Sequence, residues 1–289
     1  MDINKYEAFI KTVELGSLTK AGHLLGYTQS GISHILNSVE AEFGVKLLVR
    51  DRSGVYLSSA GKELYPYIQV ICESNKRLQE KVNELHGMES GLIRVGTINS
   101  ISTHWLPKLI RTFGQAHPNI AFQLRTGEYS EIESWIQREE IDMGFVKEPV
   151  QTNLEVYSLK RDPMVAVLPK GHPLAERETI PHKLLKDYPY ILYIDGIDSE
   201  IQDILEAQDI ASDAPYTAKD DYAIMAMVES GLGISVLPGL VLKRCPYEIE
   251  IRELEPPAYR DLAIAVKEER LLAPAAKRFL DYVVSSDLP

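Results

Sequence analysis

Three glycines divide the first 44 residues into short amphipathic runs, and this spacing constrains the fold more than any other feature of the sequence. Gly16, Gly26 and Gly44 each follow a run of helical period, and glycine readily adopts the left-handed backbone conformation that ends a helix. The sequence therefore predicts three successive helices. The residues that can cap the starts of these helices with a side-chain oxygen are Asp2 or Asn4, Ser17 and Thr28.

The second and third predicted helices are joined by a turn of about three residues that contains Gly26, which is the arrangement of a helix-turn-helix. In each helix the apolar residues recur every three or four positions, as a single buried face requires. These residues are Tyr6, Phe9, Ile10 and Val13 in the first helix, Leu18, Ala21, Leu24 and Leu25 in the second, and Ile32, Leu36, Val39 and Phe43 in the third.

After Gly44 the pattern changes from helical to extended. Apolar runs at residues 47–49 and 55–57 flank the turn-forming residues 51–54, and two such runs predict a β-hairpin. A hairpin that directly follows a helix-turn-helix is a wing.

The polar face of the third predicted helix carries short uncharged side chains, which can donate and accept hydrogen bonds at base edges. Thr28 and the free backbone N–H groups behind it can hold a phosphate. The alternative is a merely solvated face, but such a face more often carries Glu and Lys pairs, and charge is absent here until Glu40. The pattern therefore favours DNA recognition. The polar residues of this face are Gln29, Ser30, Ser33, His34 and Asn37.

A long helix is predicted from Ser58 or Ser59 to about His86, with Pro66 near its start as a site for a kink. Its apolar positions alternate at spacings of four and three, which is the pattern of a coiled-coil seam and indicates dimerisation. The alternative is a helix packed on its own domain. The seam positions are Leu64, Ile68, Ile71, Asn75, Leu78, Val82 and Leu85, of which Asn75 is the single polar member.

From Gly91 onward, strand and helix signals alternate, which predicts an α/β architecture with mostly parallel sheets. Apolar runs predict strands at residues 92–96, 121–124, 141–146, 164–168, 190–193, 234–237 and 262–266, and helical period predicts helices at 106–116, 132–139, 200–207 and 222–229.

The formal net charge of −11 is unusual for a protein that binds nucleic acid, but it is unevenly distributed. Residues 1–86 contain 10 Lys and Arg against 10 Asp and Glu, so the whole excess of acid lies in the rest of the chain. A neutral first domain can still bind DNA if its cations share one face, although charge alone then supports DNA binding only weakly.

The two cysteines, Cys72 and Cys245, are far apart, so we expect neither a disulfide framework nor a structural zinc, and the reducing cytoplasm is the expected compartment. A redox switch at Cys72 would need a partner thiol, and the sequence offers none nearby. We find no signal peptide, and no apolar run approaches the roughly 20 residues of a membrane-spanning helix. The seven histidines show no metal-ligand spacing, and no cofactor is expected.

Three segments resemble the LysR-type transcriptional regulators: residues 21–34 (AGHLLGYTQSGISH), 39–50 (VEAEFGVKLLVR) and 57–61 (LSSAG). The match covers about 60 residues at the family's spacing, and the downstream layout agrees over nearly the whole chain.

This resemblance implies a winged helix-turn-helix and a dimerising linker helix, followed by an effector domain like the periplasmic binding proteins, made of two α/β subdomains. It also implies a homodimer or homotetramer that binds double-stranded promoter DNA and a small-molecule effector. The implied domains are residues 1–58 for DNA binding, 59–87 for the linker helix and 91–289 for effector binding, with subdomain I at about 91–161 and 267–289 and subdomain II at about 162–266.

By position, Gln29, Ser30, Ser33 and His34 correspond to base-reading residues, and Arg50, Arg52 and Ser53 to the wing that meets the DNA backbone or minor groove. The chain departs from the family at residues 34–38, where Arg or Lys is common and this sequence has none. Fewer phosphate contacts predict a shallower salt dependence, at about −0.9 in slope per contact, which tetramer avidity would offset.

The resemblance also places the effector between the two subdomains. Ser100, Ser102 and Thr103 follow the first predicted strand and open a helix, a position that suits an anion. Lys147 favours an anionic effector, whereas Glu128 and Asp195 argue against a highly negative one. Each of these residues could also be an ordinary cap or turn residue. The candidate effector residues are Ser100, Ser102, Thr103, Glu128, Phe145, Lys147, Asp195 and Ala218.

A DNA-binding sensor accounts for the helix-turn-helix, the wing, the seam and the α/β domain together. The alternative, an α/β small-molecule-binding protein or enzyme without DNA-binding function, accounts only for the last of these. No nucleophile, base and orienting group can be assembled from the sequence, so an enzyme is not expected. Residues 231–233 (GLG) precede a predicted strand and are interpreted as a turn, because a dinucleotide-binding loop would follow a strand.

Overall fold

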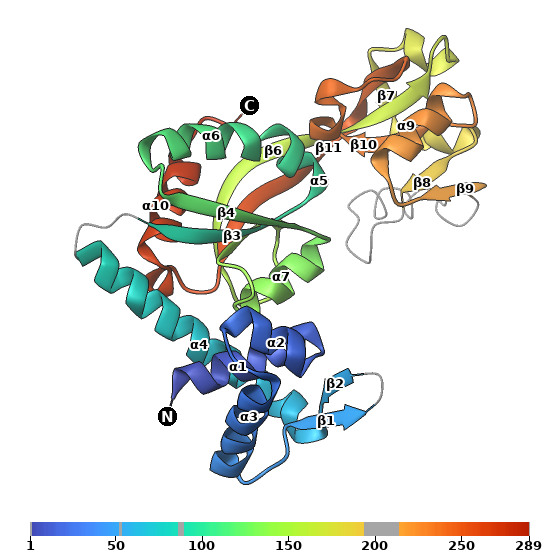
Figure 1. The fold of residues 1–289 in the computed structure, drawn as a ribbon. Coiled ribbons are helices and arrows are strands. Elements are labelled where there is room, and N and C mark those ends of the chain that lie inside the picture. Colours follow the sequence, from blue (N-terminus) through green and yellow to red (C-terminus); the bar gives the residue numbers. More distant parts are fainter. Residues whose placement is uncertain (1, 52–53, 86–89, 194–213, 289) are drawn as a thin grey trace. The chain divides into compact units, whose positions relative to one another are not determined.

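The computed structural model describes residues 2–51, 54–85, 90–193 and 214–288. The chain forms two compact units: an N-terminal unit of residues 1–90 with 272–274, and a C-terminal unit of residues 91–271 with 275–289. We describe each unit by itself (Figure 1).

The N-terminal unit begins with the three predicted helices, α1 (Ile3–Leu15), α2 (Leu18–Leu25) and α3 (Gln29–Phe43), and the predicted caps are confirmed. The side chains of Asp2, Ser17 and Thr28 each accept a hydrogen bond from a backbone N–H in the first turn of their helix. Each helix ends at a glycine whose φ lies between 60° and 74°, in the left-handed region that glycine enters without strain.

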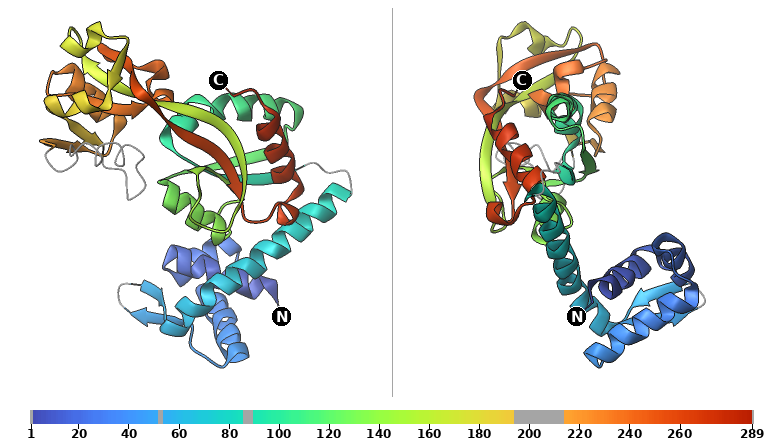
Figure 2. Two further views of the ribbon diagram at one scale, coloured as in Figure 1. Left: turned by 180° about the vertical axis from the view of Figure 1, so that it is seen from behind. Right: turned by 60° about the vertical axis from the view of Figure 1, so that its left-hand side comes forward.

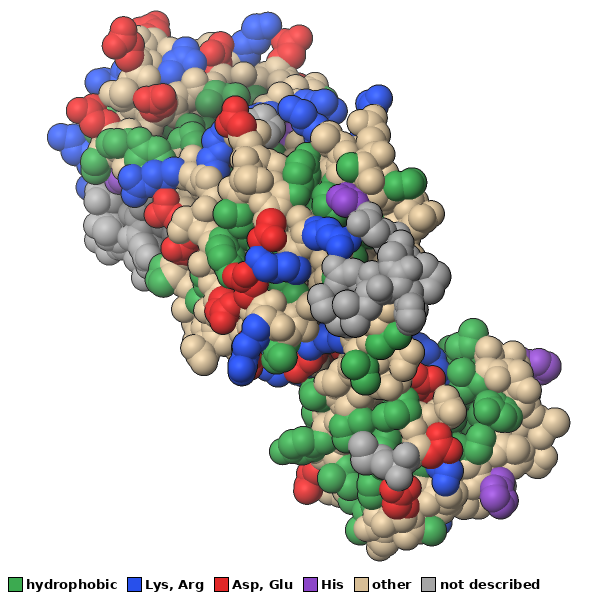
Figure 3. All heavy atoms as spheres, turned by 90° about the vertical axis from the view of Figure 1, so that its left-hand side faces the viewer, with side chains coloured by type: hydrophobic (Ala, Val, Ile, Leu, Met, Phe, Trp, Pro, Cys, Tyr) green, Lys and Arg blue, Asp and Glu red, His purple; other side chains and the backbone are tan. Residues whose placement is uncertain are grey.

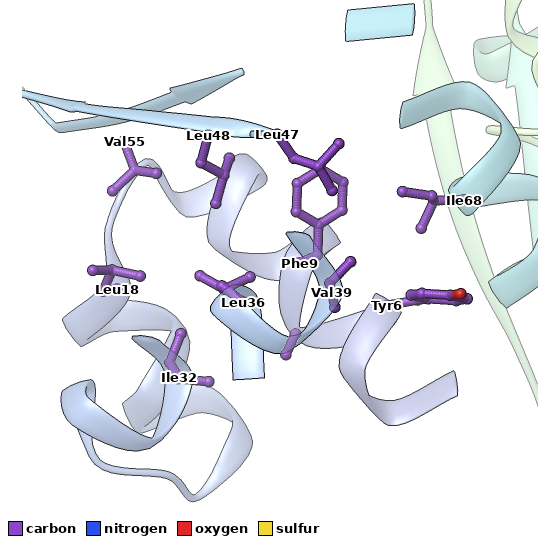
Figure 4. Close-up of a cluster of buried hydrophobic side chains, with 11 residues drawn as sticks. Tyr6, Phe9, Leu18, Ile32, Leu36, Val39, Leu47, Leu48, Val55 and Ile68 are labelled. Carbon is purple, nitrogen blue, oxygen red and sulfur yellow. The ribbon is translucent and has the colours of Figure 1, made fainter. Parts of the chain in front are cut away.

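The apolar faces of the three helices converge on one core (Figure 4). Tyr6 and Phe9 from α1 lie beside Leu36 and Val39 from α3, and all four side chains are at most 1% exposed. One predicted position differs, because Leu24 is 62% exposed. The partly buried members of the predicted faces, which pack against this core, are Ile10, Val13, Leu25 and Phe43. The spacing of apolar residues therefore identified the buried face of α1 and α3 but included one exposed leucine of α2.

The predicted hairpin is present as the antiparallel strands β1 (Leu48–Asp51) and β2 (Gly54–Leu57). Its start is attached to α3 by the buried carboxylate of Glu40, which accepts hydrogen bonds from the backbone N–H groups of Leu47 (2.9 Å) and Leu48 (3.1 Å). Burial acts to raise the pKa of Glu40, but Lys46 and these two N–H groups outweigh it and hold the pKa below its usual value. Glu40 therefore fixes the wing to the helix that precedes it.

Helix α4 (Ser59–Leu85) is the predicted long helix, and Ser58 caps it by accepting a hydrogen bond from the N–H of Gly61. Pro66 lies inside the helix. The first half of the predicted seam packs within the N-terminal unit. Ile68 is 2% exposed in the same core (Figure 4). Leu64 and Ile71 pack against this core. For these three positions, packing on the helix's own domain accounts for the apolar spacing.

The main sheet of the C-terminal unit has the strand order β10-β6-β11-β5-β3-β4, with β7 paired to β11 outside this path. The pairs β3–β4 and β3–β5 are parallel, as the βα alternation predicts. These strands are β3 (Gly91–Thr97), β4 (Ile120–Thr126), β5 (Met143–Glu148), β6 (Glu155–Pro169), β7 (Thr179–Pro181), β10 (Ser235–Pro238) and β11 (Ile249–Val266).

The prediction of mostly parallel sheets is wrong for the pairs β10–β6, β6–β11 and β11–β5, which are antiparallel, although β11 also pairs parallel with the short β7. Strands β6 and β11 are also much longer than the predicted runs at 164–168 and 262–266, and they lie side by side in both views of Figure 2. Their remaining residues are rich in charged and polar side chains, so apolar runs could not reveal them. The pairing of β11 with β6 shifts register between Glu253 and Ala258 and again between Leu262 and Ala263.

Strands β6 and β11 run through two subdomains (Figure 1). We call the part built on β3, β4 and β5 the first subdomain; it includes the helices α5 (Asn99–His104), α6 (Leu106–Ala116), α7 (Tyr129–Gln137) and α10 (Pro274–Ser285). Helix α7 packs on the sheet through Ile132, Trp135 and Ile136, and α6 meets α10 through Phe113 and Phe279, whose ring centroids are 5.1 Å apart.

The second subdomain is built on β10 and the adjoining halves of β6 and β11. Alternate residues of β6 face opposite sides: Ala166 and Leu168 pack in one apolar cluster, whereas Val165 and Val167 pack in another with helix α9 (Asp221–Glu229). The predicted helix at 200–207 lies outside the described residues. The other elements here are β8 (Ile191–Tyr193) and β9 (Tyr216–Ala218), a parallel pair, and the 3-10 helices η1 (Pro173–Glu176), η2 (His182–Asp187) and η3 (Gly239–Arg244).

A final 3-10 helix, η4 (Glu269–Leu271), connects β11 to α10. Among the described residues, no helix is both long and apolar enough to cross a membrane.

Candidate nucleic-acid interface and effector site

The polar face predicted for α3 lies on the surface of the N-terminal unit. Gln29, Ser30, His34 and Asn37 are exposed and Ser33 is half-buried, whereas Ile32 and Leu36 on the opposite face are buried. A helix with this pattern is held by its apolar side and presents its polar side to solvent. These side chains are therefore available to a macromolecule that approaches α3.

The wing contributes one cation to this face. Arg50 on β1 is exposed, and its Nη1 donates a hydrogen bond to the Oγ of Ser33 at 3.0 Å. Arg52 and Ser53, which were also predicted for the wing, lie outside the described residues. The hydrogen bond between Arg50 and Ser33 thus joins the wing to the polar face of α3.

The hydroxyl of Thr28 is occupied within the protein. Its Oγ1 accepts from the N–H of Gly31 at 3.0 Å and lies 3.0 Å from the Oγ of Ser30. Any phosphate bound at the start of α3 would therefore be held by the remaining backbone N–H groups of the first turn.

Positive charge is not concentrated into one patch on the face shown in Figure 3, where Lys and Arg side chains are interspersed with Asp and Glu. In the N-terminal unit the ammonium of Lys46 is already paired with Glu40, and that of Lys5 donates to the Oγ of Ser38 on α3 at 2.9 Å. The number of phosphate contacts stays a prediction from the sequence.

The second half of the predicted seam on α4 differs from the first half in exposure. Leu78 is 59% exposed and Val82 is 37% exposed, and Asn75 is half-buried. The side chain of Leu85 lies outside the described residues. Leu78 and Val82 are thus available to a partner helix, whereas Ile68 is already buried within the unit.

In the C-terminal unit, polar side chains converge at the carboxyl ends of the parallel strands, where open α/β sheets bind ligands. Ser100 lies on α5 after β3, and Tyr129 begins α7 after β4. Arg260 on β11 lies beside the end of β5, because its neighbour Asp261 pairs with Glu148. The guanidinium of Arg260 donates to the Ser100 Oγ at 3.1 Å and to the Tyr129 hydroxyl at 3.3 Å.

Arg260 is paired with a buried carboxylate on the neighbouring long strand. Its Nε donates to Oδ2 of Asp162 on β6 at 2.8 Å, and its Nη2 lies 2.7 Å from the same oxygen. The other oxygen of Asp162 accepts from the N–H of Leu240 in η3 at 2.9 Å. One hydrogen-bonded network therefore joins the first subdomain, the two long strands and the second subdomain.

Two acidic residues border this network. Glu128 directly precedes α7, and its carboxylate is 3.4 Å from the ammonium of Lys219, which follows β9. Asp221 begins α9 and is half-buried. Burial raises the pKa of Asp221 to about 6; Arg260 acts to lower it, and Asp220 and Glu128 act to raise it. Desolvation, joined by the charges of Asp221 and Glu128, also raises the pKa of the Tyr193 hydroxyl.

The other predicted effector residues differ in their placement. The hydroxyls of Ser102 and Thr103 both donate to the carbonyl of Asn99 within α5, and Phe145 is fully buried with its ring edge-to-face on Trp105, at 6.4 Å between centroids. Lys147 and Ala218 are half-buried, at the ends of β5 and β9. Asp195 lies outside the described residues. Of the predicted set, the structure thus brings Ser100 into the Arg260 network and Glu128 to its border.

Sequence reasoning missed Arg260, Asp162, Tyr129 and Asp221. Arg260 and Asp162 are 98 residues apart, within strand segments that carry no apolar signal. Asp221 could have been noticed as one of two adjacent carboxylates before a helical run, but its neighbour Asp220 is the one that caps α9.

A winged helix-turn-helix combined with a polar network at the carboxyl edge of a two-subdomain α/β unit defines a ligand-responsive DNA-binding regulator. Comparison with known proteins agrees. The family model described as the bacterial regulatory helix-turn-helix protein, lysR family, matches residues 3–62, and the LysR substrate binding domain matches residues 86–287. The chain is 32% identical over 284 residues to the uncharacterized HTH-type transcriptional regulator YvbU of Bacillus subtilis (strain 168), and the match covers 97% of each.

Solved structures share the whole fold. A cysteine-to-aspartate variant of full-length OxyR from Pseudomonas aeruginosa matches with a TM-score of 0.75 at 22% identity, covering 98% of this chain and 96% of that one. Full-length CbnR in complex with its target DNA matches with a TM-score of 0.66 at 20% identity, covering 98% of this chain and 99% of that one. The chain belongs to the LysR family of bacterial transcriptional regulators, as the sequence resemblance implied. It is a DNA-binding regulator with an effector-binding domain and not an enzyme.

Proposed function

We propose that this regulator reads its operator with the exposed face of α3 in the major groove. Gln29, Ser30, Ser33, His34 and Asn37 would contact base edges, and Arg50 on the wing would contact the DNA backbone or minor groove. The observation that carries this assignment is the hydrogen bond from Arg50 to Ser33, which places the cation of the wing beside uncharged groups able to donate and accept. CbnR, which shares the fold, has been determined in complex with its target DNA, and this supports DNA binding by the present chain.

We further propose the domain boundaries that the family resemblance implies: DNA binding in residues 1–58, the linker helix in 59–87 and effector binding in 91–289. The effector would bind between the two subdomains at the network of Ser100, Tyr129 and Arg260, and the protein would act in the cytoplasm, where its DNA is. The position of the network at the carboxyl edge of the parallel strands supports this site.

The protein would bind DNA as a dimer or tetramer through the exposed half of the α4 seam. Leu78→Asp should yield monomers in analytical ultracentrifugation, with the melting temperature little changed, because Leu78 is exposed. Ile71→Asp is the contrasting variant, because Ile71 packs against the core of its own unit and its loss should lower the melting temperature. If Leu78→Asp keeps the oligomeric state of the parent protein, dimerisation through the α4 seam is contradicted.

The direct test of DNA binding is a mobility shift with purified full-length protein and the intergenic DNA beside its own gene, at two salt concentrations. Saturable binding that survives nonspecific competitor would support the proposal. Few phosphate contacts should also give a shallow salt dependence. Absence of binding at low salt, with the protein folded and dimeric, would count against the assignment of α3.

A further inference from the structure

The buried guanidinium of Arg260 has more donors than the surrounding residues use. An arginine carries five N–H groups. Nε and Nη2 meet Asp162, Nη2 also donates to Ser100, and Nη1 donates to Tyr129. In the part of the chain that the structure describes, this leaves one N–H of Nη1 without an acceptor, on a side chain that is only 9% exposed. A buried donor without an acceptor is costly, so this geometry calls for an acceptor supplied from outside.

The hydroxyl of Ser100 points to the same requirement. Ser100 is 6% exposed, and its Oγ accepts from Arg260. Among the described residues, no acceptor takes the proton of this hydroxyl. Ser100 can therefore donate to the ligand while Arg260 fixes its oxygen. A carboxylate has two oxygens and only accepts, so it fits an arginine N–H and a serine O–H together.

A negative group stands near this donor pair. Asp221 is half-buried at the start of α9, and its carboxylate accepts no hydrogen bond from the described residues, because Asp220 is the residue that caps the helix. Asp221 follows two residues after Lys219, whose ammonium is 3.4 Å from the carboxylate of Glu128. Glu128 in turn directly precedes Tyr129, whose hydroxyl accepts from Arg260. The charges of Arg260 and Glu128 both act on Asp221. A carboxylate of this kind is stabilised by a ligand that donates hydrogen bonds, above all by an ammonium group.

The charges of the site decide between classes of ligand. Arg260 and Lys219 supply two positive charges, against three negative charges from Asp162, Glu128 and Asp221. The adjacent Asp220 adds a further negative charge that acts on Asp221. A ligand with only a carboxylate would add negative charge to a site that is already negative. A simple amine would leave the donors of Arg260 and Ser100 without acceptors. A molecule with both a carboxylate and an ammonium group supplies an acceptor to Arg260 and Ser100 and a positive charge to the acidic side chains.

We propose that the effector is a small amino acid-like zwitterion, whose carboxylate is held by Arg260 and Ser100 and whose ammonium group is held by Asp221 with Glu128. This inference rests on the proposed effector site and adds to it the chemical class of the ligand. Arg260 also links the ligand to the long strands, because Asp162 joins it to Leu240 in the second subdomain.

The test uses the full-length protein and a defined panel: the twenty proteinogenic amino acids, β-alanine and 4-aminobutyrate. Binding is detected by the rise in melting temperature and confirmed by calorimetry, because a ligand that binds only the folded state stabilises it. Each compound that binds is compared with the same molecule lacking the amino group and with the same molecule lacking the carboxyl group. We expect at least one zwitterion to bind, and both truncated analogues to bind roughly ten- to a hundredfold more weakly, the loss expected for one hydrogen bond to a charged group.

Two variants assign the ends of the ligand. Arg260→Lys keeps the charge but not the fork of donors and should weaken the binding of the zwitterion. Asp221→Asn should weaken the binding of the zwitterion. The analogue without an amino group should bind this variant as tightly as the parent protein or more tightly, because one repelling charge is removed. Arg111→Gln, on the exposed surface of α6, is the matched control and should change the binding of neither compound. Since Asp221→Asn removes a half-buried charge, it tests the proposal even if the Arg260 variant does not fold.

The proposal is overturned if no compound of the panel binds, or if a carboxylate without the amino group binds as tightly as the zwitterion. Both outcomes are separable from a failure of the regulator assignment. Specific mobility shifts of the neighbouring intergenic DNA, together with no response to the panel, would retain DNA binding and reject only this class of ligand. Loss of discrimination in Asp221→Asn, with the control unchanged, would support the zwitterion.

Discussion

The two units of this regulator hold their polar functional groups in opposite places. In the N-terminal unit the side chains assigned to DNA are exposed on α3, and the buried polar residues that the structure describes there are Thr12 and Glu40. In the C-terminal unit the groups assigned to the effector, such as Ser100, Asp162 and Arg260, are themselves buried. A macromolecule is contacted by side chains exposed on the surface above an apolar core. A small molecule is bound by buried side chains, and each buried polar group must have a hydrogen-bond partner.

This contrast predicts that substitutions at the reading residues cost little stability in the first unit and much in the second. The largest effect is expected for Arg260→Met, which leaves Asp162 buried without its cation and should destabilise the C-terminal unit by about 3–5 kcal/mol. Both tryptophans of the chain, Trp105 and Trp135, lie in this unit, so urea unfolding followed by tryptophan fluorescence reports on it. The double variant Asp162→Asn/Arg260→Met should recover part of the lost stability. If Arg260→Met is as stable as the parent protein, the predicted difference between the two units is wrong.

The next largest effect concerns the buried carboxylate of the N-terminal unit, which is structural. Glu40→Ala leaves the N–H groups of Leu47 and Leu48 without an acceptor and should cost roughly 2–4 kcal/mol. Faster amide exchange at these two residues, with the tryptophan transition unchanged, would confine the loss to the wing and its helix. The exposed Glu63→Ala is the control, and equal effects of the two substitutions would deny Glu40 this role.

Asp221 tests, through the pH dependence of stability, whether polar groups of the effector site cost the C-terminal unit stability. Its pKa of about 6 in the folded protein exceeds the ordinary value of 3.8, so the folded state binds the proton more tightly and loses stability as the pH rises from about 4 to about 6. Asp221→Asn removes this penalty and should stabilise the ligand-free protein at pH 7 by up to about 3 kcal/mol, with no gain below pH 4. Urea unfolding at both pH values measures the difference, and a gain that is equal at both would contradict the burial of this charge.

The smallest effect on stability is expected where binding to DNA should change most. Gln29→Ala alters an exposed residue, so the melting temperature should stay within the range of surface substitutions. Discrimination between the operator and a variant site should fall by about 1–3 kcal/mol if Gln29 reads a base. Competition mobility shifts measure this ratio, and uniform weakening on all sequences would instead assign Gln29 to the DNA backbone.

Sequence reasoning succeeded where the signal is local. Gly16, Gly26 and Gly44, with the caps before each helix, placed α1 to α3 correctly, because a cap and a left-handed glycine act within a few residues. The parallel strands β3 to β5 were likewise found from their apolar runs. The polar face of α3 was visible because an exposed face is the complement of a buried one.

The same reasoning failed where the partner is distant in sequence. The spacing of the α4 seam could not show that Ile68 is covered by the protein's own core while Leu78 is exposed. Phe145 was predicted for the effector site by its position at a strand end, but its side chain points into the core against Trp105. Arg260 and Asp162 meet only because β6 and β11 pair, and no local pattern encodes that pairing.

The place of β11 in the sheet has a consequence for synthesis of the chain on the ribosome. Residues 1–90 contain nearly all of the N-terminal unit, so that unit can fold early. Strand β11 lies between β6 and β5 but is made after both, so their edges stay unpaired until residue 266 has emerged. Unpaired edges are the surfaces by which nascent sheets aggregate. We therefore expect the nascent chain to be most prone to aggregation while residues 170–266 are being translated.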